Sequence, residues 1–477
     1  MSQRILFRVD ANSQIGFGHL IRCISISNSL EQFECIFLST DNLREFIEVD
    51  LLDNISFISI EKSQDFFEKI ESGDIVVLDG YQFDTSYCEQ IANKAKLVSI
   101  DDLAEMKIPA DIIINPTPKM RPSQYSASLH TQFLLGIRYA MLRPAFLEIA
   151  QKNALKKEQG SLFICFGGSD PLNKTKNALS AALTSGKFDA IHVVLGPGYI
   201  HQSTLNMMVD KNSNITIHNN LNELAMAELM GSTEFAILPS SGILLEGIAA
   251  KMTIISGYYV DNQKFVYESH NEMNSFIDAS DLTEANILSA IDMLKSGHLK
   301  DSLIDGKSTQ RIAKSIALLS KENACELVKA SETHLTTTFE WANDPIVRQY
   351  AFNKEPIPWE NHSKWFLNKI NSKNCWYGIL ESNGATLGSI RFDIVDKKAI
   401  ISYLVDSKQH GNGYGTLLIK LGLKAISENF NNDEIEEVHG EVFPSNIASV
   451  KTFERFGFNK KDQKDVLLFI KKFESNV

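Results

Sequence analysis

The sequence predicts an α/β protein of three consecutive domains. Its 477 residues suffice for about three domains, and 44% of them are hydrophobic, so each domain can build a core. The first 150 residues or so, and the segment after position 160, alternate short apolar runs with helical patterns, as in parallel sheets covered on both faces. Near position 331 the pattern changes. We expect domains at 1–152, 160–330 and 331–477.

The composition argues against a nucleic-acid partner and against a membrane. The chain carries 47 basic and 59 acidic side chains, a formal net charge of −12, with no block of Lys and Arg. No apolar run reaches the roughly 18 residues of a membrane span, and no signal peptide opens the chain. The six cysteines form no metal-binding spacing, so we expect reduced thiols, no metal and a cytoplasmic protein.

A glycine-rich turn near the N-terminus is the first candidate site. It follows Ile5–Val9, an apolar run of strand length, and precedes a helical pattern. Gly16 and Gly18 let the backbone approach a ligand, and His19 falls in the first helical turn, where free N–H groups favour an anion. Asp10, just past the strand, is placed to orient the imidazole. Glycines and a lone histidine also occur at purely structural turns.

Polar residues follow three further apolar runs of the first domain. The runs lie at 75–78, 97–100 and 112–114, and the residues are Asp79, Tyr81, Asp101, Asp102 and Asn115. Ligands of parallel sheets bind beyond the carboxyl ends of the strands, so these side chains are expected at one edge. Each also suits an ordinary helix cap or turn.

The second domain has two turns that suit a diphosphate. One strand runs into Gly167 and Gly168, and another ends in the loop Ser240, Ser241 and Gly242, with Glu246 in the helix that follows. Small residues expose backbone N–H groups to phosphates, and Glu246 can accept hydrogen bonds from both ribose hydroxyls. A plain strand-to-helix turn with a solvent-facing glutamate gives the same pattern.

Several motifs span these two domains. They are Arg8-x-Asp10, Ile15-Gly16-x-Gly18-His19-x-x-Arg22, Asp79-x-Tyr81, Gly136-x-x-Tyr139-Ala140-x-x-Arg143, Phe166-Gly167-Gly168-x-Asp170, Glu246 and Asn262-Gln263. Together they resemble the PseG family, the UDP-2,4-diacetamido-2,4,6-trideoxy-β-L-altropyranose hydrolases of pseudaminic acid biosynthesis. The resemblance implies two Rossmann-like lobes in a glycosyltransferase-B arrangement, a metal-independent inverting hydrolysis that releases UDP, and His19 as the catalytic residue.

The proposed chemistry needs what these residues offer. Cleavage of a glycosyl C–O bond by water needs a base, and an unperturbed imidazole titrates near ~6.5. His19 is the candidate base, with Asp10 holding its tautomer, and backbone N–H groups can hold the leaving UDP without a general acid. The glycine-rich turns and the resemblance together imply contacts to the UDP-sugar from Gly16, Gly18, Arg22, Asp79, Tyr81, Tyr139, Arg143, Gly167, Gly168, Ser240, Ser241, Gly242, Glu246, Asn262 and Gln263.

The third domain carries a second glycine-rich loop. A strand ends in Leu404-Val405-Asp406, then comes His410-Gly411-Asn412-Gly413-Tyr414-Gly415, and a helical segment follows. This order resembles motif A of the GNAT acetyltransferases, and Asn446-x-x-Ser449 extends the match. The resemblance implies that loop amides hold the pyrophosphate of acetyl-CoA, the cosubstrate. It places the acetyl-CoA contacts at Leu404, Val405, His410, Gly411, Asn412, Gly413, Tyr414, Gly415 and Asn446. The tryptophan-rich opening is similar to the branch that includes the aminosugar acetyltransferase PseH.

Two positions depart from the GNAT pattern. The usual Arg or Gln at the start of the loop is His410 here, which removes one side-chain contact to the pyrophosphate. The tyrosine that commonly protonates the CoA thiolate falls at Phe453, which has no proton to donate. Tyr403 and Ser449 are the alternative donors.

Three functions fit the sequence. The first is a bifunctional enzyme that acetylates the 4-amino group of a precursor UDP-sugar and then hydrolyses the product. The second is a UDP-sugar-dependent glycosyltransferase, because the loop at 240–246 also resembles transferases that bind UDP-GlcNAc. In the third, the C-terminal domain binds acyl-CoA without catalysis.

Overall fold

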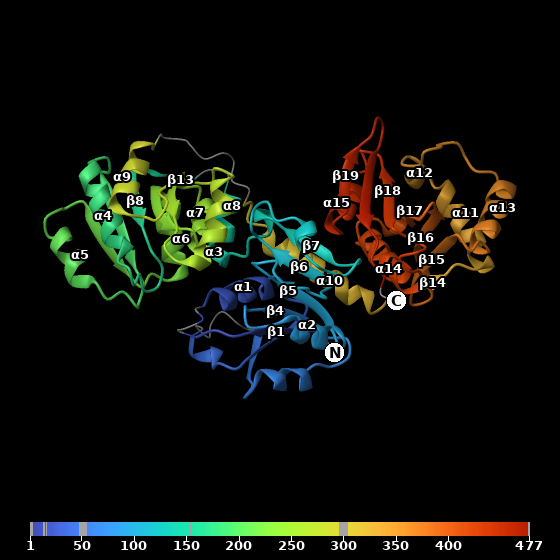
Figure 1. The fold of residues 1–477 in the computed structure, drawn as a ribbon, viewed down its shortest axis with the longest axis horizontal. Coiled ribbons are helices and arrows are strands. Elements are labelled where there is room, and N and C mark those ends of the chain that lie inside the picture. The colour runs from blue at the N-terminus through green and yellow to red at the C-terminus, as the bar shows by residue number, and fades with distance from the viewer. Residues whose placement is uncertain are drawn as a thin grey trace.

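The chain folds into three α/β units, as a computed structural model shows (Figure 1). The structure describes residues 3–12, 15, 17–46, 55–152, 155–294 and 304–475. In Figure 1 the first lobe, blue to cyan, lies between a green second lobe and an orange-to-red C-terminal domain. The predicted α/β class with two parallel-sheet lobes is confirmed. Within the described ranges, no helix is long and apolar enough to cross a membrane.

The first lobe is built on a seven-stranded parallel sheet in the order β3-β2-β1-β4-β5-β6-β7. The strands are β1 Arg4–Val9, β2 Glu34–Ser39, β3 Ile55–Ser59, β4 Ile75–Asp79, β5 Lys96–Ile100, β6 Ile112–Asn115 and β7 Gln132–Leu135. The helices are α1 Gly18–Ser27, α2 Thr85–Ala92 and α3 Pro144–Gln151, which leads into the second lobe. Every residue of β4 and β6 is buried, because the central strands of such a sheet are covered on both faces.

The second lobe repeats this plan with a six-stranded parallel sheet in the order β10-β9-β8-β11-β12-β13. The strands are β8 Glu158–Ile164, β9 Ala190–Leu195, β10 Ile215–Asn219, β11 Thr233–Pro239, β12 Thr253–Gly257 and β13 Ile277–Asp278. The helices are α4 Lys174–Ser185, α5 Gln202–Val209, α6 Glu223–Ser232, α7 Gly242–Ala249, α8 Lys264–Asn271 and α9 Glu284–Asp292. Two hydrophobic clusters cover the two faces of this sheet.

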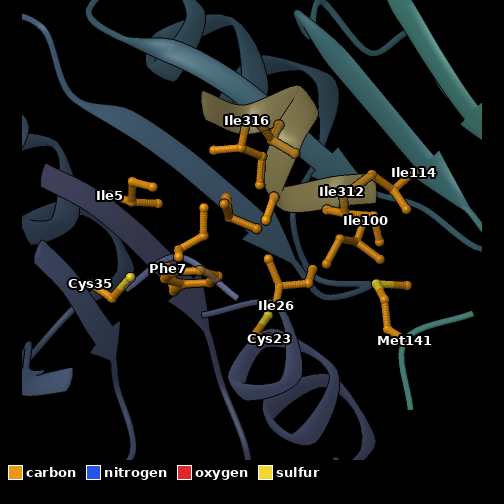
Figure 2. Close-up of a cluster of buried hydrophobic side chains, with 14 of the residues drawn as sticks. Ile5, Phe7, Cys23, Ile26, Cys35, Ile100, Ile114, Met141, Ile312 and Ile316 are labelled. Atoms are coloured by element: carbon orange, nitrogen blue, oxygen red, sulfur yellow. The ribbon is translucent and has the colours of Figure 1, made fainter. Parts of the chain in front are cut away.

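Helix α10, Ser308–Glu322, follows the second lobe in the chain but packs on the first. Ile312 and Ile316 are fully buried, and Leu319 is nearly so, among side chains of β1, β4 and α1. Figure 2 shows Ile312 and Ile316 pointing from α10 into this cluster. The spacing of these residues places them on one face of the helix. α10 thus closes the core of the first lobe, although its residues fall in the range 160–330 that we expected for the second domain.

The C-terminal domain holds a mixed seven-stranded sheet in the order β14-β15-β16-β17-β18-β20-β19. Its strands are β14 Glu326–Lys329, β15 Cys375–Ser382, β16 Ala385–Val395, β17 Lys398–Val405, β18 Glu437–Val442, β19 Asn459–Asp462 and β20 Leu467–Lys472. Its helices are α11 Leu335–Asn343, α12 Pro345–Arg348, α13 Trp359–Ile370, α14 Tyr414–Asn429 and α15 Ile447–Arg455. The parallel strands β17 and β18 pair over Lys398–Ile401 and Glu437–Gly440. Beyond that point the two strands diverge.

A buried charge cluster joins the C-terminal domain to the first lobe. Lys420 of α14 donates to Asp111 at 2.6 Å and to Glu322 of α10 at 2.5 Å, and Lys96 pairs with the same glutamate. Lys420 is only 4% exposed. Nearby, Lys471 of β20 donates to the carbonyl oxygen of Leu129 at 2.7 Å. These contacts fix the domain against the lobe.

Candidate functional site

His19 lies at the carboxyl edge of the first sheet, next to the last residue of β4. The helix α1 begins at Gly18, so the imidazole sits in its first turn, and it is 8% exposed. His19 Nδ1 lies 2.7 Å from Asp79 Oδ1. Asp79 is fully buried. A carboxylate accepts hydrogen bonds, so Nδ1 is the nitrogen that donates to Asp79, and Arg22 Nη2 lies 3.1 Å from the same ring nitrogen.

Arg22 holds the carboxylate of Asp79 in place. It lies one helical turn after His19, and its Nε and Nη2 donate to Asp79 at 2.6 and 2.5 Å. The same guanidinium donates to Asp102 at 2.9 and 3.0 Å. Burial by itself would raise the pKa of Asp79, but the charge and hydrogen bonds of Arg22, with those of His19, lower it below its ordinary value. Asp79 therefore stays ionised beneath the imidazole.

Tyr81 covers the exposed side of this cluster. Its hydroxyl donates to Asp102 at 2.9 Å, and its ring meets the His19 ring edge-on at a centroid distance of 4.8 Å. The side chain is 62% exposed, so its ring is accessible to a ligand at this edge. The predicted gathering of polar residues beyond β4 and β5 thus occurs at His19.

The expectation that Asp10 orients the imidazole is wrong. Both oxygens of Asp10 accept from the fully buried Arg8, at 2.5 and 2.9 Å, and further bonds come from Ser39, Thr40 and Gln82. Burial raises the pKa of Asp10, but Arg8 outweighs it and lowers the pKa to about 2. Asp10 ties together the ends of β1 and β2, and Asp79 takes the role at His19.

In the second lobe, Glu246 of α7 is paired with Arg143, which precedes α3. The pair is bidentate, with Nε–Oε1 at 2.7 Å and Nη2–Oε2 at 2.8 Å. Glu246 is 9% exposed. Burial raises the pKa of Glu246, and Arg143 offsets part of this rise. Two predicted ligand contacts thus form one rigid unit where the chain passes from the first lobe to the second.

The small-residue turns of the second lobe leave open space beside the backbone. A Cβ on Gly167, Gly168 or Gly242 would meet no atom within 4 Å. Ser241 precedes α7 without a side-chain cap, and no described residue accepts a hydrogen bond from the N–H of Gly242. The Ser240 hydroxyl, by contrast, is buried and bonded to Ser256 at 3.0 Å. The N–H of Gly242, rather than that hydroxyl, is available to an anion, whereas the N–H of Gly167 bonds to the Cys165 thiol.

The other residues predicted to contact the UDP-sugar have different surroundings. Gln263 accepts a hydrogen bond from the backbone N–H of Tyr259 at 3.2 Å. Tyr139 is 5% exposed and packs in the core of the first lobe, so packing is the role that the structure gives its ring. Gly18 has open space beside it. Gly16 and the side chain of Asn262 lie outside the described residues.

The glycine-rich loop of the C-terminal domain connects the diverging end of β17, with Leu404 and Val405, to α14. Gly411 and Gly413 adopt φ of 81° and 88°, which glycine tolerates best. No described residue accepts a hydrogen bond from the N–H of Gly413, Tyr414 or Gly415. These N–H donors lie at the start of a 16-residue helix, where the helix dipole favours a diphosphate.

Comparison with known proteins assigns this domain. Residues 325–459 match the family model of the acetyltransferase (GNAT) domain. The C-terminal unit is a GNAT domain. Among solved structures, the spermidine N-acetyltransferase of Vibrio cholerae is 15% identical, covering 32% of this chain and 96% of that chain with a TM-score of 0.29.

The N-terminal half has its own relatives. It is homologous to the UDP-2,4-diacetamido-2,4,6-trideoxy-beta-L-altropyranose hydrolase of Campylobacter jejuni, at 27% identity over 55% of this chain and 93% of that protein. The spore coat polysaccharide biosynthesis protein SpsG of Bacillus subtilis is 22% identical over 56% of this chain and 81% of its own. An uncharacterized protein of Methanocaldococcus jannaschii is 24% identical over 96% of this chain and 97% of its own. The archaeal protein therefore aligns with both the hydrolase-like half and the GNAT domain of this chain.

Within the GNAT domain, Tyr403 and Phe453 have different surroundings. Tyr403 lies on the diverging part of β17, and its hydroxyl donates to Ser449 at 2.8 Å. Phe453 is 2% exposed and stacks on Phe469 at a centroid distance of 5.1 Å. Asn446 caps α15 by accepting from the Ser449 N–H at 3.2 Å. Tyr403 and Ser449 are thus the hydroxyl pair at the opening of the sheet, and Phe453 belongs to the core.

No cluster suited to a metal ion is found in the part of the chain that the structure describes. There, no group of three or more His, Cys, Asp and Glu side chains is placed to hold one. The carboxylates nearest His19 are occupied by Arg22 and Tyr81.

Proposed function

We propose that the chain is a bifunctional enzyme that acetylates the 4-amino group of a UDP-linked 4-amino sugar and then hydrolyses the product, UDP-2,4-diacetamido-2,4,6-trideoxy-β-L-altropyranose, to the free sugar and UDP. The observation that carries the proposal is the buried His19–Asp79–Arg22 arrangement. Homology of the N-terminal half to a hydrolase of that substrate and the fused GNAT domain both support it.

In the hydrolytic step, His19 is the general base. Nδ1 donates a hydrogen bond to Asp79, so Nε2 is the nitrogen that takes a proton from water while the water oxygen bonds to the anomeric carbon. The bond between that carbon and the diphosphate oxygen breaks, and UDP leaves with the electron pair. Such a single displacement inverts the anomeric centre. Two carboxylates, Asp79 and Asp102, face one guanidinium, so an imidazolium at His19 balances the local charge.

The second lobe holds the leaving group in this proposal. The amides at Gly168 and Gly242 donate to the diphosphate, whose negative charge grows as the bond breaks. Glu246, fixed by Arg143, accepts from the ribose hydroxyls through the lone pairs that the guanidinium leaves unused.

In the acetylation step, the unprotonated 4-amino group attacks the thioester carbonyl of acetyl-CoA. The C–S bond of the tetrahedral intermediate then breaks, and Tyr403 gives its proton to the departing sulfur. Burial raises the pKa of Tyr403, which keeps the phenol protonated at neutral pH. The proton that the amine loses restores the phenol through solvent.

The deciding experiment is NMR of the full chain with the UDP-linked 4-amino sugar, with and without acetyl-CoA. We expect N-acetylation and then free sugar plus UDP when acetyl-CoA is present. Free sugar that appears without any acceptor excludes the alternative glycosyltransferase. If UDP forms only when a second sugar acceptor is added, the hydrolase proposal is wrong.

We expect Glu246→Gln to weaken UDP binding about tenfold, because an amide accepts fewer hydrogen bonds from the ribose and pairs poorly with Arg143. Isothermal titration with UDP measures this change. Glu228→Gln, on an exposed part of the neighbouring helix α6, is the matched control and should bind UDP as the wild type does. Equal affinity of the Glu246 variant and the wild type would show that Glu246 serves Arg143 alone.

We expect Tyr403→Phe to lower kcat for acetyl transfer about 10- to 100-fold, because the thiolate then leaves without a proton donor. The KM for acetyl-CoA should change little, since the hydroxyl acts at the leaving sulfur. Release of CoA is followed with a disulfide reagent. Tyr377→Phe on β15, two strands away, is the control. A Tyr403 variant with wild-type kcat would remove Tyr403 from the acid role.

A further inference from the structure

Helix α10 connects the core of the first lobe to the glycine-rich loop of the GNAT domain. Ile312 and Ile316 anchor it in the first lobe (Figure 2). Near its C-terminal end, Leu318 and Lys321 contact the loop. A Cβ on Gly413 would lie 2.9 Å from Leu318 Cδ1. The Lys321 ammonium donates to the carbonyl oxygen of Asn412 at 3.1 Å.

The peptide plane between Asn412 and Gly413 gives this contact a direction. In a planar trans peptide, the carbonyl oxygen and the following N–H point to opposite sides. Lys321 holds the Asn412 carbonyl on the side of α10, so the Gly413 N–H points away from α10. It is one of the donors at the start of α14 that no described residue accepts. Lys321 therefore binds one side of the peptide whose other side presents the Gly413 N–H to an anion.

Lys321 also brings a positive charge to this loop. His410 stands where GNAT domains usually have Arg or Gln, and its Nε2 lies 3.1 Å from the carbonyl oxygen of Val405. The ring is thus held against its own strand. The ammonium of Lys321 lies 5.6 Å from the centroid of the Tyr414 ring, in the first turn of α14.

We propose that Lys321 is a positioning residue of the acetyl-CoA site, supplied by a helix from the core of the hydrolase-like half. Its charge polarises the Asn412–Gly413 peptide and fixes the orientation in which the Gly413 N–H donates to the pyrophosphate. The inference rests on the proposed acetyl-CoA-dependent activity of the GNAT domain. It makes acetyl-CoA binding depend on the docking of that domain against the first lobe.

Lys321→Met in the full chain tests this role, because methionine keeps most of the apolar stem and removes the charge. We expect the Kd and the KM for acetyl-CoA to rise about 5- to 20-fold, with kcat and the KM for the amino sugar unchanged. The increase should shrink at high salt, since the Lys321 side chain is exposed. Lys321→Arg should restore most of the affinity. S-acetylpantetheine, which lacks the pyrophosphate, should react equally well with both proteins.

The matched control is Lys314→Met, an equal charge change on an exposed position of α10. It should bind acetyl-CoA as the wild type does. An unchanged Kd for Lys321→Met, or an equal loss with Lys314→Met or with S-acetylpantetheine, would overturn the inference while leaving the acetyltransferase proposal intact. A wild-type protein that binds no acetyl-CoA would overturn both.

Discussion

Replacement of His19 by Ala is expected to lower kcat for UDP release by about 10²- to 10⁴-fold, because the attacking water then loses its base. Binding of UDP should persist, since the proposed contacts to the nucleotide lie in the second lobe. The thermal midpoint should move little, because the variant loses one hydrogen bond and leaves Asp79 paired with Arg22. The rate is measured by stopping the reaction with the acetylated UDP-sugar at set times and quantifying the UDP released.

Two further variants separate catalysis from structure at this site. Asp79→Asn keeps the shape of the pair but can donate to Nδ1, so the wrong tautomer forms and the rate should fall nearly as far as in His19→Ala. His192→Ala, on β9 in the second lobe, should keep the wild-type rate. If His19→Ala retains more than about a tenth of the rate, His19 is not the base.

Strand positions in the two lobes follow from local sequence alone. The apolar runs at 75–78, 97–100 and 112–114 lie within β4, β5 and β6, because consecutive apolar residues of this length can be buried on both faces. The convergence of polar residues beyond β4 and β5 follows from parallel topology, which brings the carboxyl ends of strands to one edge.

Pairings between neighbouring strands could not be read in the same way. Asp10 and Asp79 follow or end adjacent strands, and Val9 is the residue in register with Asp79. Sequence position alone places both carboxylates at this edge of the sheet, and in the structure Asp10 pairs with Arg8 instead of His19. Spacing in the chain does not encode which cation reaches which carboxylate.

The sequence also does not predict where α10 packs. The apolar face of Ser308–Glu322 predicts a helix that packs on a core, but it does not identify the core. The helix follows the second lobe in sequence and completes the first in space. The helix reaches the GNAT loop only because it packs back on the first lobe, so no motif in either half predicts this contact.

The second large effect concerns the charge cluster between the GNAT domain and the first lobe. We expect Lys420→Met to destabilise this interface by about 3–5 kcal/mol, because Asp111 and Glu322 stay buried with Lys96 as their remaining cation. Calorimetry should show a lower midpoint and a separate transition of the GNAT domain. Lys408→Met, an exposed lysine of the same domain, should leave the midpoint unchanged.

The pH dependence of this loss distinguishes buried charge from lost packing. Burial raises the pKa of Asp111, but Lys420 and Lys96 outweigh it and lower the pKa to about 2. The pKa of Glu322 is lowered too. A lowered carboxyl pKa stabilises the fold above the unfolded value near ~4, and this stability is lost as the pH falls toward about 2. In Lys420→Met the two carboxyl groups can bind protons at a higher pH. The difference in unfolding free energy between the variant and the wild type should therefore narrow as the pH falls from about 7 to about 4. A gap that stays constant over this range would assign the effect of Lys420 to packing of its stem rather than to charge.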